Sequence, residues 1–329
     1  MKLAIEKLIS WLRQHRELGP LIGLAALCIL FEVFSKGKFL TFPQLSALAA
    51  LSASLGIVAV GVTLLMISGE FDLSVSQTFA LAPILMATLI TEVGLPSILA
   101  LFMALLGVSF VGLINGVIST LARVPSLIVT LGMLFVITSV NRIIAGGFPV
   151  QLFGIEDPIL GLMGSDVPGT PVGAPFLWML AVFALSWFVL DRTQYGSWIR
   201  AAGHNAGEVG RAMGVPIRVV KVTNFVLSSV LAGLAGCLQL ADFGSAGVNS
   251  GENYNLLAIV AVVMGGTSLF GVRGTVLGTL LGTLMIGTLK TGLILVGAGG
   301  EYYTGLIGIL LLLASLVNVK AESLRRKGG

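Results

Sequence analysis

Side chains able to do chemistry are few in this chain, and their spacing points away from catalysis. The two histidines, His15 and His204, lie far apart in basic, polar segments. The two cysteines, Cys28 and Cys237, stand in apolar stretches, where a free cysteine is ordinarily a small buried hydrophobe. No phosphate-binding G-x-x-x-x-G-K-S/T sequence occurs, and no histidine stands near an acid within an apolar stretch. We therefore predict no catalytic residue, no cofactor site and no metal ligand in this chain.

A polar cluster in the sequence SGEFDLSVSQ interrupts an otherwise apolar stretch. It carries Glu70 and Asp72, and a bare charge in or beside a membrane is costly unless it is paired or wet. One interpretation is a helix break capped by Asp72 or Ser74. The other is a polar lining for the inner gate of a translocation path, to which Ser76 and Gln77 would also belong. The two interpretations do not exclude each other.

Lys290 stands inside another long apolar stretch. An ionisable residue in such a place is a functional-site hypothesis by default, although a lysine can also extend its ammonium group toward an interface. We add it to the candidate path together with three further polar residues, namely Asn115, Arg142 and Thr267.

The elements that must position these residues are membrane helices. Of 329 residues, 56% are hydrophobic and 10% are charged, against about 25% charged in an ordinary soluble domain. A spanning helix needs about 20 mostly apolar residues. We therefore predict an all-α, polytopic membrane protein with ten spans, near residues 19–35, 44–68, 73–92, 96–121, 124–145, 175–191, 219–241, 255–271, 274–297 and 301–319.

The basic residues predict the orientation. With both termini in the cytosol, 15 of the 19 lysines and arginines fall on the cytosolic side and three on the outer side, while Lys290 falls within a span. Short loops with an excess of Lys and Arg face the cytosol. The opposite orientation would reverse this asymmetry, and an odd number of spans would leave one basic terminus outside.

We expect one transmembrane domain over residues 1–329. It would begin with a cytosolic amphipathic lead (1–18), which has no signal-peptide cleavage site after it, and end with a basic cytosolic tail (320–329). The loop over 146–174 would lie in the periplasm and carries acids but no lysine or arginine. The loop over 192–218 would be the longest in the cytosol and the most basic.

The cytosolic loop contains a second candidate site, a short helix. Asn205 is a good N-cap, and Glu208 three residues later completes a capping-box-like pair. Gly214 followed by Pro216 supplies a stop. The helix is either an ordinary connector on the lipid headgroups or a docking helix that inserts into a groove of a cytosolic partner.

Four motifs resemble the permease subunits of bacterial ABC importers for sugars, of the ribose, arabinose and xylose type. The cytosolic loop matches G-N-x-x-A-A-R-x-x-G-I/V through Gly203, Asn205, Arg211, Gly214 and Val215. AIVAVVMGGTSLFGVRGTVLGTLLG, SGEFDLSVS and VPSLIVTLG match three further family stretches. The matches run in order from about residue 55 to residue 318.

The resemblance implies a bacterial inner-membrane subunit that forms the path for a sugar or sugar-like solute and has no ATPase site of its own. It implies a second permease chain, identical or related, two cytosolic ATP-binding subunits that hold the ATP and magnesium, and a periplasmic substrate-binding protein. It makes the short helix the coupling helix to the ATPase, with Asn205, Glu208, Val209, Arg211, Ala212, Met213 and Gly214 as its residues.

The chain departs from the family pattern at positions that bear on the substrate. Asn255 and Leu257 replace two acids before the GGTSL stretch, and Thr138 replaces an arginine that Arg142 could substitute one helical turn later. Thr291 replaces an asparagine. In the same span, glycines and threonines form a small-residue face that we interpret as a packing surface, with the second permease chain as a candidate partner.

Two other functions stay open at this stage. A related permease for branched amino acids or nucleosides would have similar motifs. An ion-coupled secondary transporter would need intramembrane acids or broken half-helices near the midplane, and the acids here stand at span boundaries.

Overall fold

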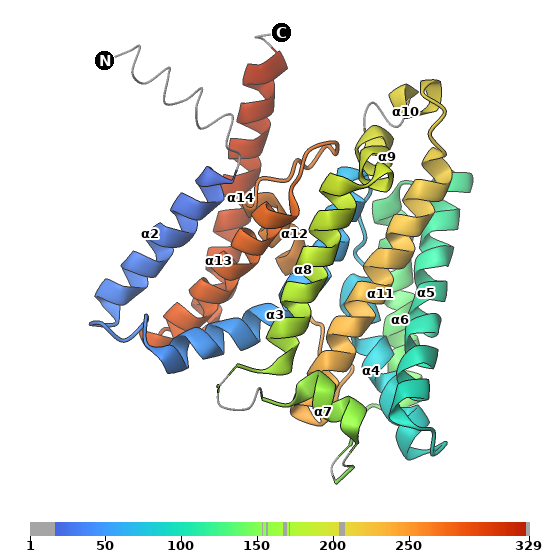
Figure 1. Ribbon diagram of the computed structural model, residues 1–329, viewed down its shortest axis with the longest axis vertical. Helices are drawn as coiled ribbons and strands as arrows, with labels where there is room; N and C mark the ends of the chain where they lie inside the picture. Colours follow the sequence, from blue (N-terminus) through green and yellow to red (C-terminus); the bar gives the residue numbers. More distant parts are fainter. Residues whose placement is uncertain are drawn as a thin grey trace.

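The computed structural model describes residues 17–152, 154–155, 157–166, 170, 172–203 and 208–326. These residues form a helical bundle with one pair of two-residue strands, β1 (Val150–Gln151) and β2 (Ser245–Ala246), which run antiparallel (Figure 1). The helices are α2 (Leu18–Phe34), α3 (Phe42–Ile67), α4 (Val75–Thr91), α5 (Ser97–Leu121), α6 (Ser126–Ala145), α7 (Pro158–Gly164), α8 (Ala174–Arg192), α9 (Gln194–Gly203), α10 (Glu208–Ala212), α11 (Ile217–Phe243), α12 (Tyr254–Met264), α13 (Val276–Leu295) and α14 (Gly300–Arg326).

The helices fit the predicted spans. Six of them are long and apolar enough to cross a membrane, namely α3, α5, α6, α8, α11 and α13. Four shorter apolar helical stretches, in α2, α4, α12 and α14, occupy the positions of the other four predicted spans. The chain is therefore an all-α, multi-pass membrane protein, and the number of ten crossings stays a prediction.

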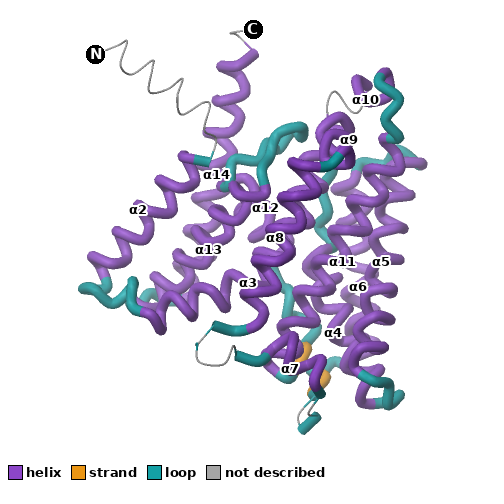
Figure 2. Tube along the Cα trace, viewed as in Figure 1, coloured by secondary structure: helices purple, strands orange, loops and turns teal. Residues whose placement is uncertain are grey.

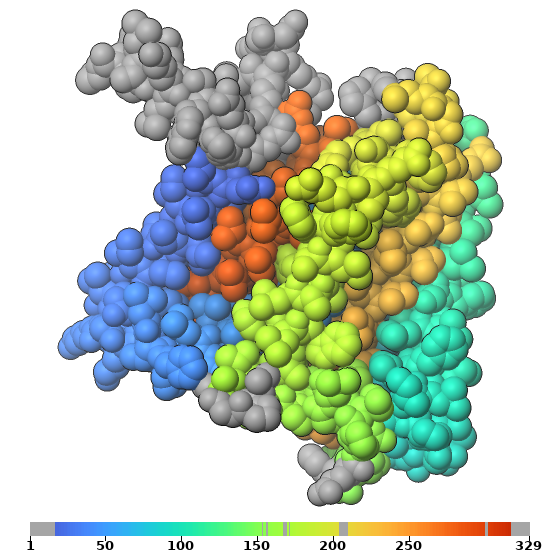
Figure 3. All heavy atoms as spheres, viewed as in Figure 1, coloured from blue at the N-terminus to red at the C-terminus, as the bar shows by residue number. Residues whose placement is uncertain are grey.

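The bundle has two distinct ends. The start of α2, the end of α14, α9 and α10 lie at one end, which we call the α10 end. The two strands and α7 lie at the opposite end, which we call the sheet end (Figure 2). Between the ends, α3 is almost wholly buried, whereas α5, α6 and α8 expose leucine, isoleucine and phenylalanine side chains. In Figure 3, α2, α8, α11 and α5 form the visible face. An apolar outer surface of this kind fits a lipid environment.

The small-residue face of α13 packs inside this chain. Gly282 lies against the carbonyl of Ala261 in α12, and a Cβ at Gly292 would collide with the ring of Phe31 in α2. Such close approach gives van der Waals contact between membrane helices, which have no hydrophobic drive to associate. The packing interpretation is confirmed, but the suggestion that a second permease chain covers these glycines is wrong, because α2, α3 and α12 cover them.

One predicted span is interrupted, and one predicted break is confirmed. The span predicted over 255–271 ends as a helix at Met264, because Gly265 and Gly266 follow and Gly266 adopts a left-handed φ of 88°. Residues 265–275 are an irregular connection to α13, which hydropathy alone did not reveal. Residues 68–74 are also non-helical, with Gly69 at φ 82°, and they coincide with the break predicted between the spans 44–68 and 73–92. We call both non-helical segments interruptions.

Candidate translocation path and coupling region

Asp72, Ser74 and Asn115 form a buried hydrogen-bond network at the interruption before α4. The backbone N–H and the hydroxyl of Ser74 donate to Asp72 Oδ1, at 2.8 and 2.5 Å. Asn115 Nδ2 of α5 donates to the Ser74 Oγ at 2.9 Å. Asp72 Oδ2 and Asn115 Oδ1 have no hydrogen-bond partner among the described residues. The structure thus confirms the predicted helix break. The predicted cap is wrong, because no side chain among the described residues accepts a hydrogen bond from the first turn of α4, and Asp72 instead accepts from the backbone N–H of Ser74, the residue before the helix.

The backbone of the interruption is satisfied by side chains of neighbouring helices. The N–H groups of Phe71 and Leu73 donate to the hydroxyls of Ser126 and Thr130 in α6, at 3.1 and 3.0 Å. The carbonyl of Leu73 accepts from Asn255 Nδ2 at the start of α12, at 3.2 Å. Irregular backbone within a membrane protein persists only where such partners replace the missing helical bonds. The interruption is therefore an element of the fold with its own supporting side chains.

A second polar pair lies one turn further along α4. Asn141 Nδ2 of α6 donates to the backbone carbonyl and to the Oε1 of Gln77, at 3.0 and 3.1 Å. Asn141 is fully buried, whereas its neighbour Arg142 is exposed on the other face of α6. Arg142 therefore does not take part in the Gln77–Asn141 pair, and its place in the path stays a prediction. Sequence reasoning missed Asn141, although an amide inside an apolar helix was a usable signal.

The other predicted path residues lie elsewhere. Ser76 is buried at the start of α4, where its backbone carbonyl touches Gly251. Thr267 is buried in the interruption between α12 and α13, beside Gly274. Lys290 is half-buried in α13, and its Nζ lies 5.9 Å from the centre of the Tyr303 ring in α14. This cation–π contact places Lys290 against α14 and outside the Asp72 network. Its role in the path stays a prediction.

Three backbone segments meet at the α10 end. The N–H of Val272, in the interruption before α13, donates to the carbonyl of Ile67 at the end of α3, at 2.8 Å. A Cβ at Gly203, the last residue of α9, would collide with that carbonyl and lie 2.7 Å from the Val272 nitrogen. A Cβ at Gly271 would lie 3.2 Å from the Gly69 Cα. We call this contact of Gly69, Gly203 and Gly271 the glycine junction. It joins α9 to both helix interruptions.

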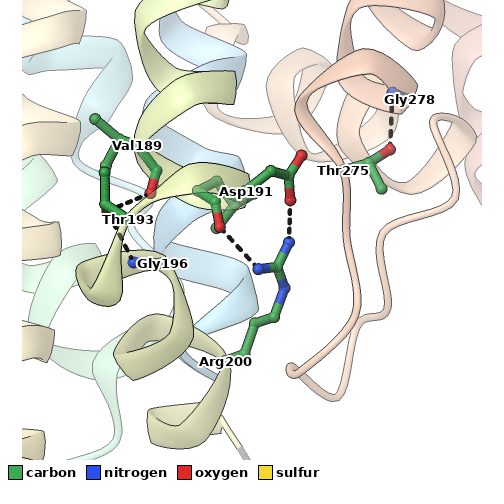
Figure 4. Close-up of polar contacts among 8 residues, drawn as sticks. Val189, Asp191, Thr193, Gly196, Arg200, Thr275 and Gly278 are labelled. Atoms are coloured by element: carbon green, nitrogen blue, oxygen red, sulfur yellow. Dashed lines mark hydrogen bonds and ion pairs between the residues drawn. The ribbon is translucent and has the colours of Figure 1, made fainter.

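The turn from α8 into α9 is held by polar contacts (Figure 4). Arg200 Nη1 donates to the carbonyl of Leu190 at 2.7 Å, and Arg200 also forms an ion pair with Asp191. The Thr193 hydroxyl donates to the carbonyl of Val189 at 2.6 Å. These contacts satisfy the last carbonyls of α8 and set the direction of α9. Sequence analysis treated this stretch as loop and missed α9.

Tyr195 attaches α9 to α11. Its hydroxyl donates to Asn224 Oδ1 at 2.8 Å, and burial raises the pKa of Tyr195 to about 12. The phenol therefore stays protonated at neutral pH and remains a donor. A second link crosses to the interruption before α4, where Lys221 of α11 forms an ion pair with Glu70 at 2.5 Å.

The predicted coupling helix corresponds to α10, which covers Glu208–Ala212 and is followed by Gly214 at φ 75°. Its predicted end is therefore confirmed. Arg211, Ala212 and Met213 are exposed, and Met213 exposes 73% of its surface. Asn205 lies outside the described residues, as do the side chains of Glu208 and Val209.

The comparisons with known proteins cover nearly the whole chain. Residues 44–315 match the family model described as the branched-chain amino acid transport system permease component. The chain is 33% identical to the ribose import permease protein of Escherichia coli strain K12, over 95% of this chain and 96% of that protein. It is 29% identical to the fructose import permease protein of Rhizobium meliloti, over 96% and 89% of the two chains.

A third relative is the xylose/arabinose import permease protein of Sulfolobus acidocaldarius, 31% identical over 89% of this chain and 82% of that protein. No solved structure matches. Because the family model covers most of the chain and a relative above 30% identity covers almost all of it, this chain belongs to the family of ABC importer permease components.

Proposed function

We propose that this chain is the membrane-spanning subunit of an ATP-driven, binding-protein-dependent importer for a monosaccharide in a bacterial inner membrane. The observation that carries the proposal is near full-length similarity to import permeases whose names specify ribose, fructose and xylose or arabinose. The two interruptions, before α4 and after α12, support a path through this subunit. Buried polar groups and broken helices mark transport routes in membrane proteins.

The orientation belongs to the same proposal. The α10 end would face the cytosol, with ten spans and both termini on that side. The excess of lysine and arginine in the segments assigned to that side supports this orientation, and so does the position of α2's start and α14's end at one end of the bundle.

The ATPase would bind at α10, and ATP and magnesium would be held by that partner. The proposed coupling residues are Asn205, Glu208, Val209, Arg211, Ala212, Met213 and Gly214. An exposed methionine on a short helix suits insertion into a groove of a partner. Movement of α10 would pass to α9, and from α9 through the glycine junction to both interruptions.

The proposed path includes the Asp72 network and the Gln77–Asn141 pair, with Ser76 and Thr267 beside them. Binding of hydroxyl groups requires carboxylate, amide and hydroxyl partners, and these residues supply all three. Two partially exposed amides, of Gln77 and Asn255, stand at the surface of the cluster. A second permease chain would complete the path.

The test is uptake in proteoliposomes that contain this chain, its ATPase and its binding protein. Radiolabelled D-ribose, D-xylose, L-arabinose and D-fructose are offered in turn, and L-leucine is included because the family description names branched-chain amino acids. The proposal expects ATP-dependent uptake of a sugar that ionophores do not abolish. Uptake of leucine alone would establish the amino acid alternative, and uptake that requires an ion gradient would establish a secondary transporter.

A further inference from the structure

A cavity of about 470 Å³ opens at the sheet end, on the side of the bundle remote from α9 and α10. The turn after α6 forms one wall, the last turns of α11 form the second, and the segment between β2 and α12 forms the third. The side chains that matter most for recognition are Phe148, Gln239, Phe243, Asn249 and Ser250. Its volume falls in the range of small-molecule sites, about 300–1,000 Å³.

The walls are held in place by backbone contacts. The two strands pair with Val150 opposite Ala246, and the N–H of Leu152 donates to the carbonyl of Gly244 at 2.8 Å. In the third wall, the N–H of Gly247 donates to the Ser250 Oγ at 2.9 Å. Hydrogen bonds within the chain therefore fix the first wall against the end of α11 and brace the third wall.

The chemistry of the lining suits a neutral, hydroxyl-rich solute. Phe148 and Phe243 are 77% and 63% exposed, so both offer a ring to an incoming molecule. A pyranose or furanose presents C–H groups that pack on such a ring, and hydroxyls that bond to the amides of Gln239 and Asn249. Among the residues that the structure describes, no acidic or basic side chain lines the cavity. A zwitterionic amino acid would leave its ammonium and carboxylate without charged partners here, and that is unfavourable.

The third wall leads directly to the polar interruption. Gly251, the residue after Ser250, packs against the backbone carbonyl of Ser76 so closely that no side chain fits. The Tyr254 ring then packs at a tilt against the Phe79 ring of α4, with 4.8 Å between the ring centres, and Asn255 Nδ2 donates to the carbonyl of Leu73. The third wall therefore separates a solute in the cavity from the first residues of α4 and α12.

We propose that this cavity is a receiving site for a monosaccharide, which it takes up before the solute enters the path between the interrupted helices. The inference rests on the proposed function and adds to it a site, a ligand class and the residues that recognise it. Phe148 and Gln239 supply the stacking face and the hydrogen bonds.

The test is saturation-transfer difference NMR on the intact permease–ATPase complex in nanodiscs, without the binding protein. The probes are D-ribose, D-xylose and D-fructose, with L-leucine as the charged comparison. We expect transfer to the ring protons of at least one sugar and none to leucine. Phe148→Ala and Gln239→Ala should each reduce the sugar signal by roughly five- to tenfold, as loss of a stacking face or a hydrogen bond predicts.

Two variants control this experiment. Phe148→Tyr keeps the ring and should keep the signal. Phe135→Ala removes another exposed ring, in α6, that does not line the cavity, and it should change nothing. The absence of transfer to all three sugars, or an undiminished signal in both cavity variants, would overturn the proposal. So would a Phe148→Ala complex that loses binding-protein affinity but retains its sugar signal, because the cavity would then serve protein docking.

Proteoliposome uptake separates this result from the proposed function. ATP-driven sugar uptake without a cavity-dependent NMR signal would refute only the receiving site. A cavity-dependent sugar signal in a complex that imports no sugar would refute the proposed function and leave the site standing.

Discussion

The α-carbon of Gly203, at the end of α9, packs against the backbone carbonyl of Ile67, at the end of α3. The same carbonyl oxygen accepts a hydrogen bond from the N–H of Val272. The end of α3, the end of α9 and the connection before α13 therefore meet at this oxygen. Two of these segments lead into helix interruptions and the third leads to α10. The contact is therefore a direct connection between α9, which precedes the proposed ATPase site, and both interruptions.

Gly203→Ala should impair both stability and coupling. A methyl group at this position collides with two backbone segments that cannot rotate away, and overpacking of this kind costs about 1–3 kcal/mol. We expect a lower unfolding temperature in detergent and a smaller ratio of sugar imported to ATP hydrolysed. Gly132→Ala in α6 is the control, since nothing lies within 4 Å of the added carbon. Equal behaviour of the two variants would argue against the junction.

Removal of the Asp72 carboxylate should loosen the start of α4. Asp72→Ala leaves the N–H and hydroxyl of Ser74 without their acceptor in a buried site, at a cost of about 1–3 kcal/mol. Asp72→Asn retains an acceptor oxygen and should be milder. Thermal unfolding and uptake of both variants are the measurements.

A double-mutant cycle tests whether Asp72 and Asn115 act through Ser74 as one network. Asn115→Ala should cost less in Asp72→Ala than in the native chain, because the shared hydroxyl has already lost its orientation. Strictly additive losses would mean that the two residues act independently.

Glu208→Ala combined with Arg211→Ala should uncouple transport. The change removes both charged side chains of α10, so the ATPase subunit should co-purify weakly and uptake should fall. Lys36→Ala with Glu92→Ala removes the same two charge types from exposed positions after α2 and α4 and should leave both readouts unchanged. Normal uptake and normal co-purification in the α10 variant would exclude it as the coupling helix.

The attachment of α9 should weaken at high pH. Burial raises the pKa of Tyr195 to about 12, so the folded state binds this proton more tightly than the unfolded state, whose pKa is about 10. The contribution of the protonated Tyr195 phenol to the free energy of unfolding is therefore complete below about pH 10 and is lost as the pH rises toward 12. Tyr195→Phe should be less stable at pH 8, because it lacks the bond to Asn224, and should lose less stability than the native chain between pH 9 and 12.

Local sequence was sufficient for some of these features. Helices α3 and α5 were predictable because each is a stretch of more than 20 mostly apolar residues, the length that a membrane span needs. The end of α10 just before Gly214 was predictable, because glycine tolerates the left-handed φ that stops a helix. Asp72 and Ser74 were predictable as a pair, since a carboxylate reaches a backbone N–H two residues later without any help from the rest of the chain.

Features that depend on distant partners were not predictable. Asn141 finds its partner Gln77 across 64 positions, and hydropathy cannot distinguish it from the exposed Arg142 beside it. The helix ending at Met264 looked continuous because valine and methionine precede the glycines and apolar residues follow them.

Sequence by itself determined that this chain is a multi-pass membrane protein, through apolar length and the scarcity of charge, both of which are local properties. Only tertiary structure decided what the small and polar residues do. Gly203 and Gly251 matter because of backbone atoms far away in sequence that approach them, and Asp72 matters because α5 brings Asn115 to its partner. The cavity at the sheet end exists only because two short strands, almost a hundred residues apart, pair and hold its walls together.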